Sequence, residues 1–229
     1  MKNYIIKLFL FLVFCGINAT IYAQKVTIHA EPSNATISID GAEVGVGSYT
    51  VKFGRKVDFY IVKVSAPGYL TKTFRLMKSN PNKTVLYKLF PDEALQNSSG
   101  SDDAGMDMAN KWFEITCSND NNNLNDIEIW KRLTGVALNY FDNFEVRDMT
   151  TGWLRSSWKS TTFTNQVVRT QLEIRTVNIN DDEKTFKVRI SSEIRDITQG
   201  THNYVKYNRV LNQYVSLIDE LQTSISKGK

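Results

Sequence analysis

Two segments in the second half of the chain alternate apolar and polar residues with a period of two, the pattern of strands that are buried on one side. In the first segment Val168, Leu172 and Ile174 share the apolar side, and in the second segment Phe186 and Ile190 do so. We predict two neighbouring strands joined by a turn near residues 178–183. Their polar sides carry Arg169, Gln171, Glu173, Arg175, Lys187, Arg189, Glu193 and Arg195.

The polar side of these two strands holds five cations and two acids. An excess of positive charge on one sheet face attracts acidic ligands over long range, and we predict that this face binds an acidic partner. A solvated face with cross-strand ion pairs is the alternative. The predicted partner-binding residues are Arg169, Arg175, Lys187, Arg189 and Arg195.

Helical spacing occurs both before and after this pair of strands. Apolar residues from Ile127 to Phe141 recur at intervals of three and four, which predicts a helix that begins near Asn125. The same spacing from Tyr204 to Ile225 predicts a long C-terminal helix packed on the sheet, with a coiled coil as the alternative. Tyrosines at the start of this stripe indicate a ligand groove between helix and sheet. The residues predicted to line it are Trp153, Tyr204 and Tyr207.

Together these elements predict an α+β domain over residues 111–229, with β-α-β-β-β-α order and two helices packed on an antiparallel sheet. Gly152–Trp158, followed by the Arg-flanked strand Arg169–Arg175, resembles part of the helix-grip domains of the outer-membrane barrel-assembly lipoprotein. This resemblance supports the fold, whereas fold alone does not determine function.

Residues 24–90 contain only strand patterns. Six short runs, among them Val26–Ile28, Ile37–Ile39 and Phe59–Val64, are separated by turn signals such as Asp40-Gly41. We therefore predict a small all-β antiparallel sandwich in this part of the chain.

Several motifs of this sandwich resemble a PEGA domain over about residues 25–90. They are EPSNATISIDG at 31–41, Val44-Gly45, and APGY at 66–69. Ser33-Asn34 replaces the Glu-Gly that gives the family its name, and Val46-Gly47-Ser48 stands where Thr-Pro is usual. The resemblance implies an exported bacterial envelope module that binds or spaces without catalysis.

Residues 1–23 are typical of a secretory signal peptide. A basic start precedes the apolar run Leu8–Cys15, and the small Ala23 precedes the expected cleavage site. The apolar run is shorter than the ~20 residues needed to span a bilayer. We predict export to the periplasm or cell envelope, with membrane association at most peripheral. Lipidation of Cys15 is the alternative, against which the bulky Phe14 argues.

Residues 91–110 contain five acids and no base, and almost no β-branched or aromatic residue, which predicts a flexible linker between the two domains. The whole chain has 28 Lys and Arg against 24 Asp and Glu, and loss of the leader removes two of the lysines. This small excess argues against nucleic acid as a partner. Cys117 is the one cysteine outside the leader, and its place on the apolar side of a strand predicts a buried core residue.

Common catalytic patterns are missing from the sequence. His29 and His202 have no cysteine or carboxylate at metal-ligand spacing, and there is no G-x-S-x-G, P-loop or dinucleotide motif. We expect a non-enzymatic protein without a metal or cofactor, acting as an interaction or assembly module for an envelope protein or an acidic glycan. The alternative is a periplasmic protein that binds a glycan or small ligand. An enzyme with two carboxylates across a cleft is the third possibility.

Overall fold

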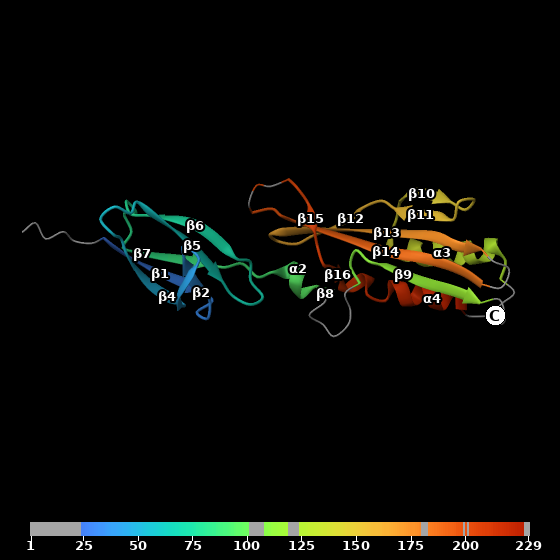
Figure 1. The fold of residues 1–229 in the computed structure, drawn as a ribbon, viewed down its shortest axis with the longest axis horizontal. Helices are drawn as coiled ribbons and strands as arrows, with labels where there is room; N and C mark the ends of the chain where they lie inside the picture. Colours follow the sequence, from blue (N-terminus) through green and yellow to red (C-terminus); the bar gives the residue numbers. More distant parts are fainter. Residues whose placement is uncertain are drawn as a thin grey trace, which may run out of the picture. The chain divides into compact units, whose positions relative to one another are not determined.

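The computed structural model of the chain forms two compact units, one ending at Phe90 and the other beginning at Pro91 (Figure 1). The described part is predominantly β, with mainly antiparallel sheets and few helices. No helix within it is long and apolar enough to cross a membrane. The predicted leader, residues 1–23, lies outside the described residues. The structure describes residues 24–100, 108–118, 124–179, 183–198, 200 and 202–226.

The first unit consists of two small sheets whose apolar sides enclose one core. Val26, Ile28, Ile37, Val62 and Val64 are fully buried in this core, as the alternation of their strands requires. One sheet has the order β4-β1-β7 and the other β3-β2-β5-β6. The strands are β1 (Lys25–Glu31), β2 (Thr36–Ile39), β3 (Ala42–Val46), β4 (Ser48–Lys52), β5 (Phe59–Ser65), β6 (Lys72–Met77) and β7 (Thr84–Lys88).

Two details of the first unit differ from the sequence prediction. Strand β3 was not predicted, because Gly45 interrupts a short run that has little alternation. The sandwich is also not wholly antiparallel, since β1 pairs with β7 in parallel register, with Thr27 opposite Thr84. The predicted turn does join β2 to β3, with Asp40 and Gly41 both at positive φ.

Gly47 holds the loop between β3 and β4 against the loop that precedes β2. Its φ is +70°, and a Cβ atom at this position would lie 2.3 Å from the backbone oxygen of Ser33. Its N–H donates to the carbonyl of Ala35, and its carbonyl accepts from the N–H of Ala30, each at 2.8 Å. Only glycine meets both the backbone conformation and the close approach.

The second unit is built on a seven-stranded sheet with the two long strands β13 (Gln166–Ile179) and β14 (Glu183–Asp196) at its centre. These are the strands predicted from the period of two, and they pair antiparallel with Leu172 opposite Ile190. The remaining strands of the sheet are β9 (Trp112–Ser118), β10 (Phe144–Asp148), β11 (Trp153–Ser156), β12 (Lys159–Thr162) and β15 (Val205–Lys206).

Two helices, α3 (Asp126–Tyr140) and α4 (Leu217–Ser226), contribute to the core of this unit. Asn125 caps α3 and forms a capping box with Glu128, which satisfies backbone donors at the start of the helix. The helices pack against each other, and their buried side chains join the inward side of β9, β13 and β14 in one cluster. In Figure 1 they lie behind the sheet, so the face toward the reader is free of helices.

The apolar stripe of α3 differs from the prediction at its first turn. Ile127 is 50% exposed, whereas Ile129 is buried together with Leu133 and Ala137. Both isoleucines fit a three-or-four spacing to the later apolar residues, so the pattern alone did not distinguish them.

The C-terminal helix is much shorter than predicted, because it begins at Leu217. The preceding segment forms β15, β16 (Arg209–Leu211) and a 3₁₀ turn (Asn212–Tyr214). Ile218, Leu221 and Ile225 are buried in the core of their own unit, so the stripe packs within the unit. The order of elements therefore contains more strands than the predicted β-α-β-β-β-α.

The start of the predicted flexible linker is ordered. Glu93–Gln96 forms the short helix α2, and Ser98–Gly100 forms strand β8, which pairs with β16. Ala94 is fully buried, and the Glu93 carboxylate accepts hydrogen bonds from the N–H and hydroxyl of Thr164. Residues 91–100 thus belong to the second unit, while residues 101–107 of the predicted linker lie outside the described residues.

Strand β9 and helix α4 are joined by side-chain contacts to the backbone. The Gln222 amide accepts from the N–H of Thr116 at 3.0 Å and donates to its carbonyl at 2.9 Å. Cys117 is fully buried, forms no disulfide, and donates from Sγ to the carbonyl of Ile225 at 3.2 Å. The cysteine is thus a core residue, as predicted.

Candidate interaction surface

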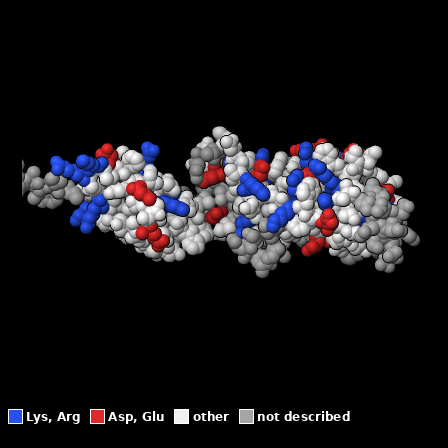
Figure 2. Space-filling model, viewed as in Figure 1, with Lys and Arg blue, Asp and Glu red and all other residues white. Residues whose placement is uncertain are grey.

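The helix-free face of the sheet carries all five cations that the sequence placed together. Side chains alternate along a strand, so Leu172 and Ile174 point into the core while Glu173 and Arg175 lie on the opposite face. Figure 2 shows basic side chains, with acidic ones among them, over the sheet of the second unit.

The strand register brings residues from four strands into two neighbouring rows. One row consists of Arg155, Glu173, Arg189 and Trp112, and the other consists of Trp153, Arg175, Lys187 and Glu114. The tryptophan rings and the arginine guanidiniums are therefore neighbours, both within a strand and between adjacent strands.

These rows form a continuous series of cation–π contacts. From guanidinium carbon to ring centroid, Trp153 lies 5.3 Å from Arg155 and 5.2 Å from Arg175. Trp112 lies 5.6 Å from Arg175 and 4.5 Å from Arg189. All four distances are within the range of an attractive cation–π interaction. We refer to Arg155, Trp153, Arg175, Trp112 and Arg189 as the arginine–tryptophan ladder.

Glu173 lies beneath the ladder and is only 2% exposed. Its carboxylate accepts from Arg175 Nε at 2.7 Å, from Arg189 Nη2 at 2.5 Å and from Trp153 Nε1 at 3.2 Å. Burial by itself raises the pKa of Glu173, but the hydrogen bonds and charges of Arg175 and Arg189 outweigh burial and hold this pKa below its usual value. One buried charge thus fixes the positions of three ladder side chains.

A second group of planar side chains lies on the same face, toward the end at β15. The guanidinium of Arg169 is 4.5 Å from the ring centroid of Trp158 and 4.0 Å from that of Tyr204. Arg195 lies 5.2 Å from the same Tyr204 ring. We refer to Trp158, Arg169, Tyr204 and Arg195 as the distal cluster.

Most cations of the face are paired with carboxylates. Arg169 contacts Glu193 through both Nε and Nη2, at 2.7 and 2.5 Å. Arg155 pairs with Glu145 at 3.0 Å. Lys187 lies 3.5 Å from Glu114. The face is therefore closer to electroneutrality than its count of arginines indicates, and its character is planar and polar as much as cationic.

The predicted ligand groove is not formed. Trp153 belongs to the ladder and Tyr204 to the distal cluster. Tyr207 lies elsewhere, with its hydroxyl 2.8 Å from Ser98 Oγ, and burial raises its pKa. The prediction was wrong because it assumed one helix through both tyrosines, whereas the chain here runs through β15 and β16.

Three residues of the surface were missed by the sequence prediction: Trp112, Trp158 and Arg155. Their spacing gave no signal, because Trp112 and Arg155 lie on strands other than the two that alternate strongly, and Trp158 lies between β11 and β12. The central role of Glu173 was also missed, since its partners Arg189 and Trp153, 16 and 20 residues away, come beside it only through the strand register.

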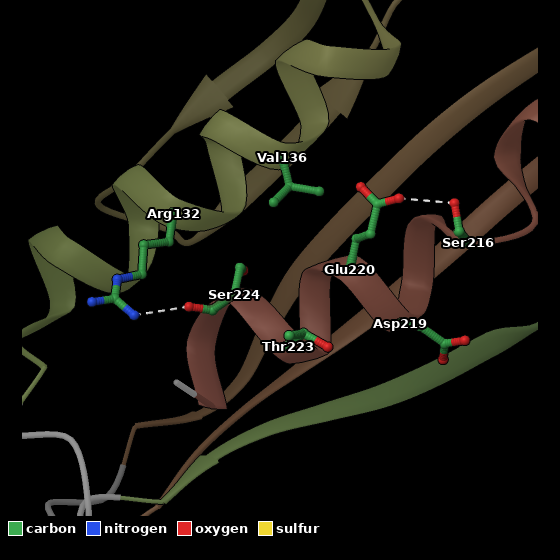
Figure 3. Close-up of a pocket in the computed structure, with 7 residues that line it drawn as sticks. All are labelled: Arg132, Val136, Ser216, Asp219, Glu220, Thr223 and Ser224. Carbon is green, nitrogen blue, oxygen red and sulfur yellow. Dashed lines mark hydrogen bonds between the residues drawn. The ribbon is translucent and has the colours of Figure 1, made fainter. Parts of the chain in front are cut away.

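A separate open groove of about 530 Å³ runs between α3 and α4 (Figure 3). Arg132 Nη1 donates to the carbonyl of Ser224 at 2.9 Å. The Glu220 carboxylate accepts from the hydroxyls of Ser216 at 2.8 Å and Tyr140 at 2.5 Å. Burial and the hydrogen bond to Glu220 raise the pKa of Tyr140. The complete lining is Arg132, Val136, Ser216, Asp219, Glu220, Thr223 and Ser224.

Within the described ranges, no group of three or more His, Cys, Asp or Glu side chains is placed to hold a metal ion. In the groove, the carboxylate of Asp219 points away from that of Glu220 (Figure 3).

Comparison with known families assigns the first unit. Residues 23–89 match the PEGA domain family. The resemblance seen over residues 25–90 is thus confirmed, and the PEGA domain corresponds to the sandwich of β1 to β7. No curated protein matches the chain. The PEGA match ends before the second unit, so the ladder and the distal cluster must be interpreted from their own chemistry.

Proposed function

We propose that this chain is a non-enzymatic, exported bacterial envelope protein that binds a partner protein through the helix-free face of its second unit. The observation that carries the proposal is the ladder, in which two tryptophans and three arginines lie together on a sheet and three of the five are hydrogen-bonded to one buried carboxylate. Tryptophan, tyrosine and arginine are the residues most enriched among those that dominate binding energy at protein interfaces. Side chains held in place before binding also lose less entropy when a partner binds.

A protein partner is favoured over a glycan by how the aromatic rings are used. Sugars bind tryptophan by stacking on an open ring face, but Trp112 and Trp153 are each contacted by two guanidinium groups. The ladder also lies on a sheet face rather than in a cleft, which suits a broad contact with another protein.

Export and the envelope location are supported by the sequence. PEGA domains are typical of extracellular and periplasmic proteins, and residues 1–23 have the pattern of a leader. The similarity of the second unit to helix-grip domains of the barrel-assembly lipoprotein stays a prediction and agrees with an assembly role.

The proposal is tested by cross-linked capture from envelopes of the cells that make the protein, followed by quantitative mass spectrometry. We expect a reproducible set of envelope proteins whose yield falls at least tenfold when Trp112→Ala and Arg195→Gln are combined, because interface anchors are worth about 2 kcal/mol each. Lys131→Gln, which removes one charge from an exposed position of α3, serves as the control. Equal capture by the double variant and the wild type would exclude this face.

The groove between α3 and α4 supports one second candidate function, the binding of a small polar ligand. Its lining offers a guanidinium, carboxylates and hydroxyls within one open groove (Figure 3). A thermal-shift screen of sugars and organic acids addresses it directly. A true ligand raises the melting temperature of the wild type and leaves that of Thr223→Trp, which fills the groove, unchanged.

A further inference from the structure

We infer that the partner presents an acidic peptide segment, and that Arg195 of the distal cluster binds one of its carboxylates. This inference rests on the proposed function, and it names the chemistry of the partner and the residue that selects it. It comes from a difference between Arg195 and the other arginines of the same face.

Each of the other arginines on this face already has a carboxylate partner. Arg155 is paired with Glu145, Arg169 with Glu193, and Arg175 and Arg189 share Glu173. In the part of the chain that the structure describes, Arg195 has no such partner. The buried Nε–H groups of Arg155, Arg189 and Arg195 all lack an acceptor, so the missing carboxylate is what distinguishes Arg195. A guanidinium without a carboxylate partner keeps its charge and its terminal donors available to an incoming carboxylate.

The surroundings of Arg195 hold its guanidinium in place for such a ligand. Arg195 lies over the ring of Tyr204, and Arg169 contacts the same ring at 4.0 Å. Arg169 is itself held by two contacts to Glu193. A fixed guanidinium presents parallel N–H groups that match the two oxygens of a carboxylate, which gives both direction and selectivity.

The local charge also favours an acidic ligand at this end of the face. Lys206 is exposed on β15, opposite Glu193, and Glu193 is already engaged by Arg169. The charges of Arg195 and Lys206 are therefore not cancelled by the carboxylate between them. The neighbouring strand β15 lies at the end of the sheet order, so an extended peptide can pass beside Arg195 along this edge.

A peptide is favoured over an acidic glycan for the same reason as on the ladder. The planar side chains here, Trp158 and Tyr204, are both contacted by Arg169, and Tyr204 is also contacted by Arg195. Stacking of a sugar ring would displace these guanidiniums, whereas a carboxylate on a flexible peptide side chain reaches Arg195 without disturbing them.

The test is an NMR titration of the full mature chain with an end-blocked hexaglutamate peptide, observing the Nε–Hε signals of the arginines. We expect the Arg195 signal to shift with saturation, since its guanidinium gains a carboxylate partner, and a hexaglutamine peptide to cause no shift. Arg195→Gln should weaken hexaglutamate binding at least fivefold. Arg195→Lys should recover only part of this loss, because it keeps the charge without the planar donors. Lys131→Gln should bind as the wild type does.

Three results would overturn the inference. One is a shift confined to other arginines, and another is binding that Arg195→Gln leaves unchanged. The third is tighter binding of trigalacturonate than of hexaglutamate, which would make the partner a glycan. If envelope capture falls with Trp112→Ala alone but hexaglutamate does not bind at Arg195, the inference fails while the proposed function stands. If capture is independent of both residues, the proposed function fails as well.

Discussion

Replacement of Glu173 by glutamine is expected to lower the free energy of unfolding of the second unit by about 3 kcal/mol. Removing one member of a buried ion pair leaves its partners without compensation, which costs about 3–5 kcal/mol. The lower end applies because the side chains of Arg175 and Arg189 are 53% and 34% exposed and reach water. Glutamine keeps the size of the side chain, so the loss reports the charge rather than a cavity.

Urea unfolding followed by tryptophan fluorescence measures this effect in the second unit alone. The four tryptophans of the chain are Trp112, Trp130, Trp153 and Trp158, all beyond residue 90. Glu193→Gln is the matched control, since that carboxylate is 29% exposed and pairs with the single arginine Arg169 among the described residues, and it should cost less than about 1 kcal/mol. Similar losses for the two variants would contradict the central role of Glu173.

The same carboxylate predicts a pH dependence of stability. The pKa of Glu173 is lower in the folded chain than its usual value, so the folded state binds its proton less readily than the unfolded state. Its stabilising effect is therefore complete above the unfolded pKa, about 4.3, and is lost as the pH falls through the lower folded value. The difference in stability between wild type and Glu173→Gln should therefore shrink as the pH is lowered from 6 to 3. A difference that stays constant would show that the pKa is not lowered.

Gly47→Ala is expected to destabilise the PEGA domain by about 3 to 4 kcal/mol. Alanine at positive φ costs on the order of 1 kcal/mol, and its Cβ would lie 2.3 Å from the carbonyl oxygen of Ser33, which is backbone and cannot rotate away. The loop cannot easily relax, because both backbone groups of Gly47 are hydrogen-bonded to neighbouring segments.

Gly41→Ala separates the two contributions to this effect. Gly41 also has positive φ, but a Cβ there would have no atom within 4 Å, so its replacement should cost only the conformational strain of about 1 kcal/mol. Hydrogen exchange measured by mass spectrometry gives the stability of the first unit from its own peptides, without interference from the second. Equal losses at the two glycines would mean that the contact with Ser33 relaxes at no cost.

Gly47 also connects the two places where the sequence departs from the usual PEGA motif. Ser33 belongs to the replaced Glu-Gly, and Gly47 lies where Thr-Pro is usual, yet the two residues touch. A larger side chain at 47 would not fit against the path that the backbone takes at Ser33. The two departures are therefore physically compatible with each other, which neither motif shows when it is considered alone.

The parts of the fold that were predictable are those set by local patterns. The alternation around Leu172 and Ile190 indicates that one side of each strand is buried. This conclusion does not depend on which strands lie next to them. The cap at Asn125 is likewise local, since it needs only Glu128 three residues later. Local patterns failed where a distant partner decides the structure. Residues 98–100 contain nothing but Ser and Gly, and they form a strand because Arg209–Leu211 pairs with them.

The candidate surface divides in the same way. Its cations were found on one face because alternation places Arg169 and Arg175 there regardless of register. Its aromatic half was not found, because Trp112 and Trp153 meet Arg175 only once β9, β13 and β11 are aligned across the sheet. The tyrosine stripe misled for a related reason. Tyr204 and Tyr207 have a helical spacing, but they lie on either side of the short strand β15, whose pairing with β14 is not visible in the local pattern.

The contact between Gln222 and Thr116 bears on how the protein avoids self-association. An edge strand of a sheet has unpaired backbone N–H and C=O groups. A strand of another molecule can pair with them, and such pairing often starts aggregation. At Thr116 both groups are already occupied by the amide of Gln222, which imitates a neighbouring peptide. Helix α4 therefore also protects the edge strand β9 from pairing with another molecule. A chain that lost its last helix would expose this edge strand and part of the core together, and its characteristic failure would be fibrous or amorphous precipitation rather than a soluble, partly folded protein.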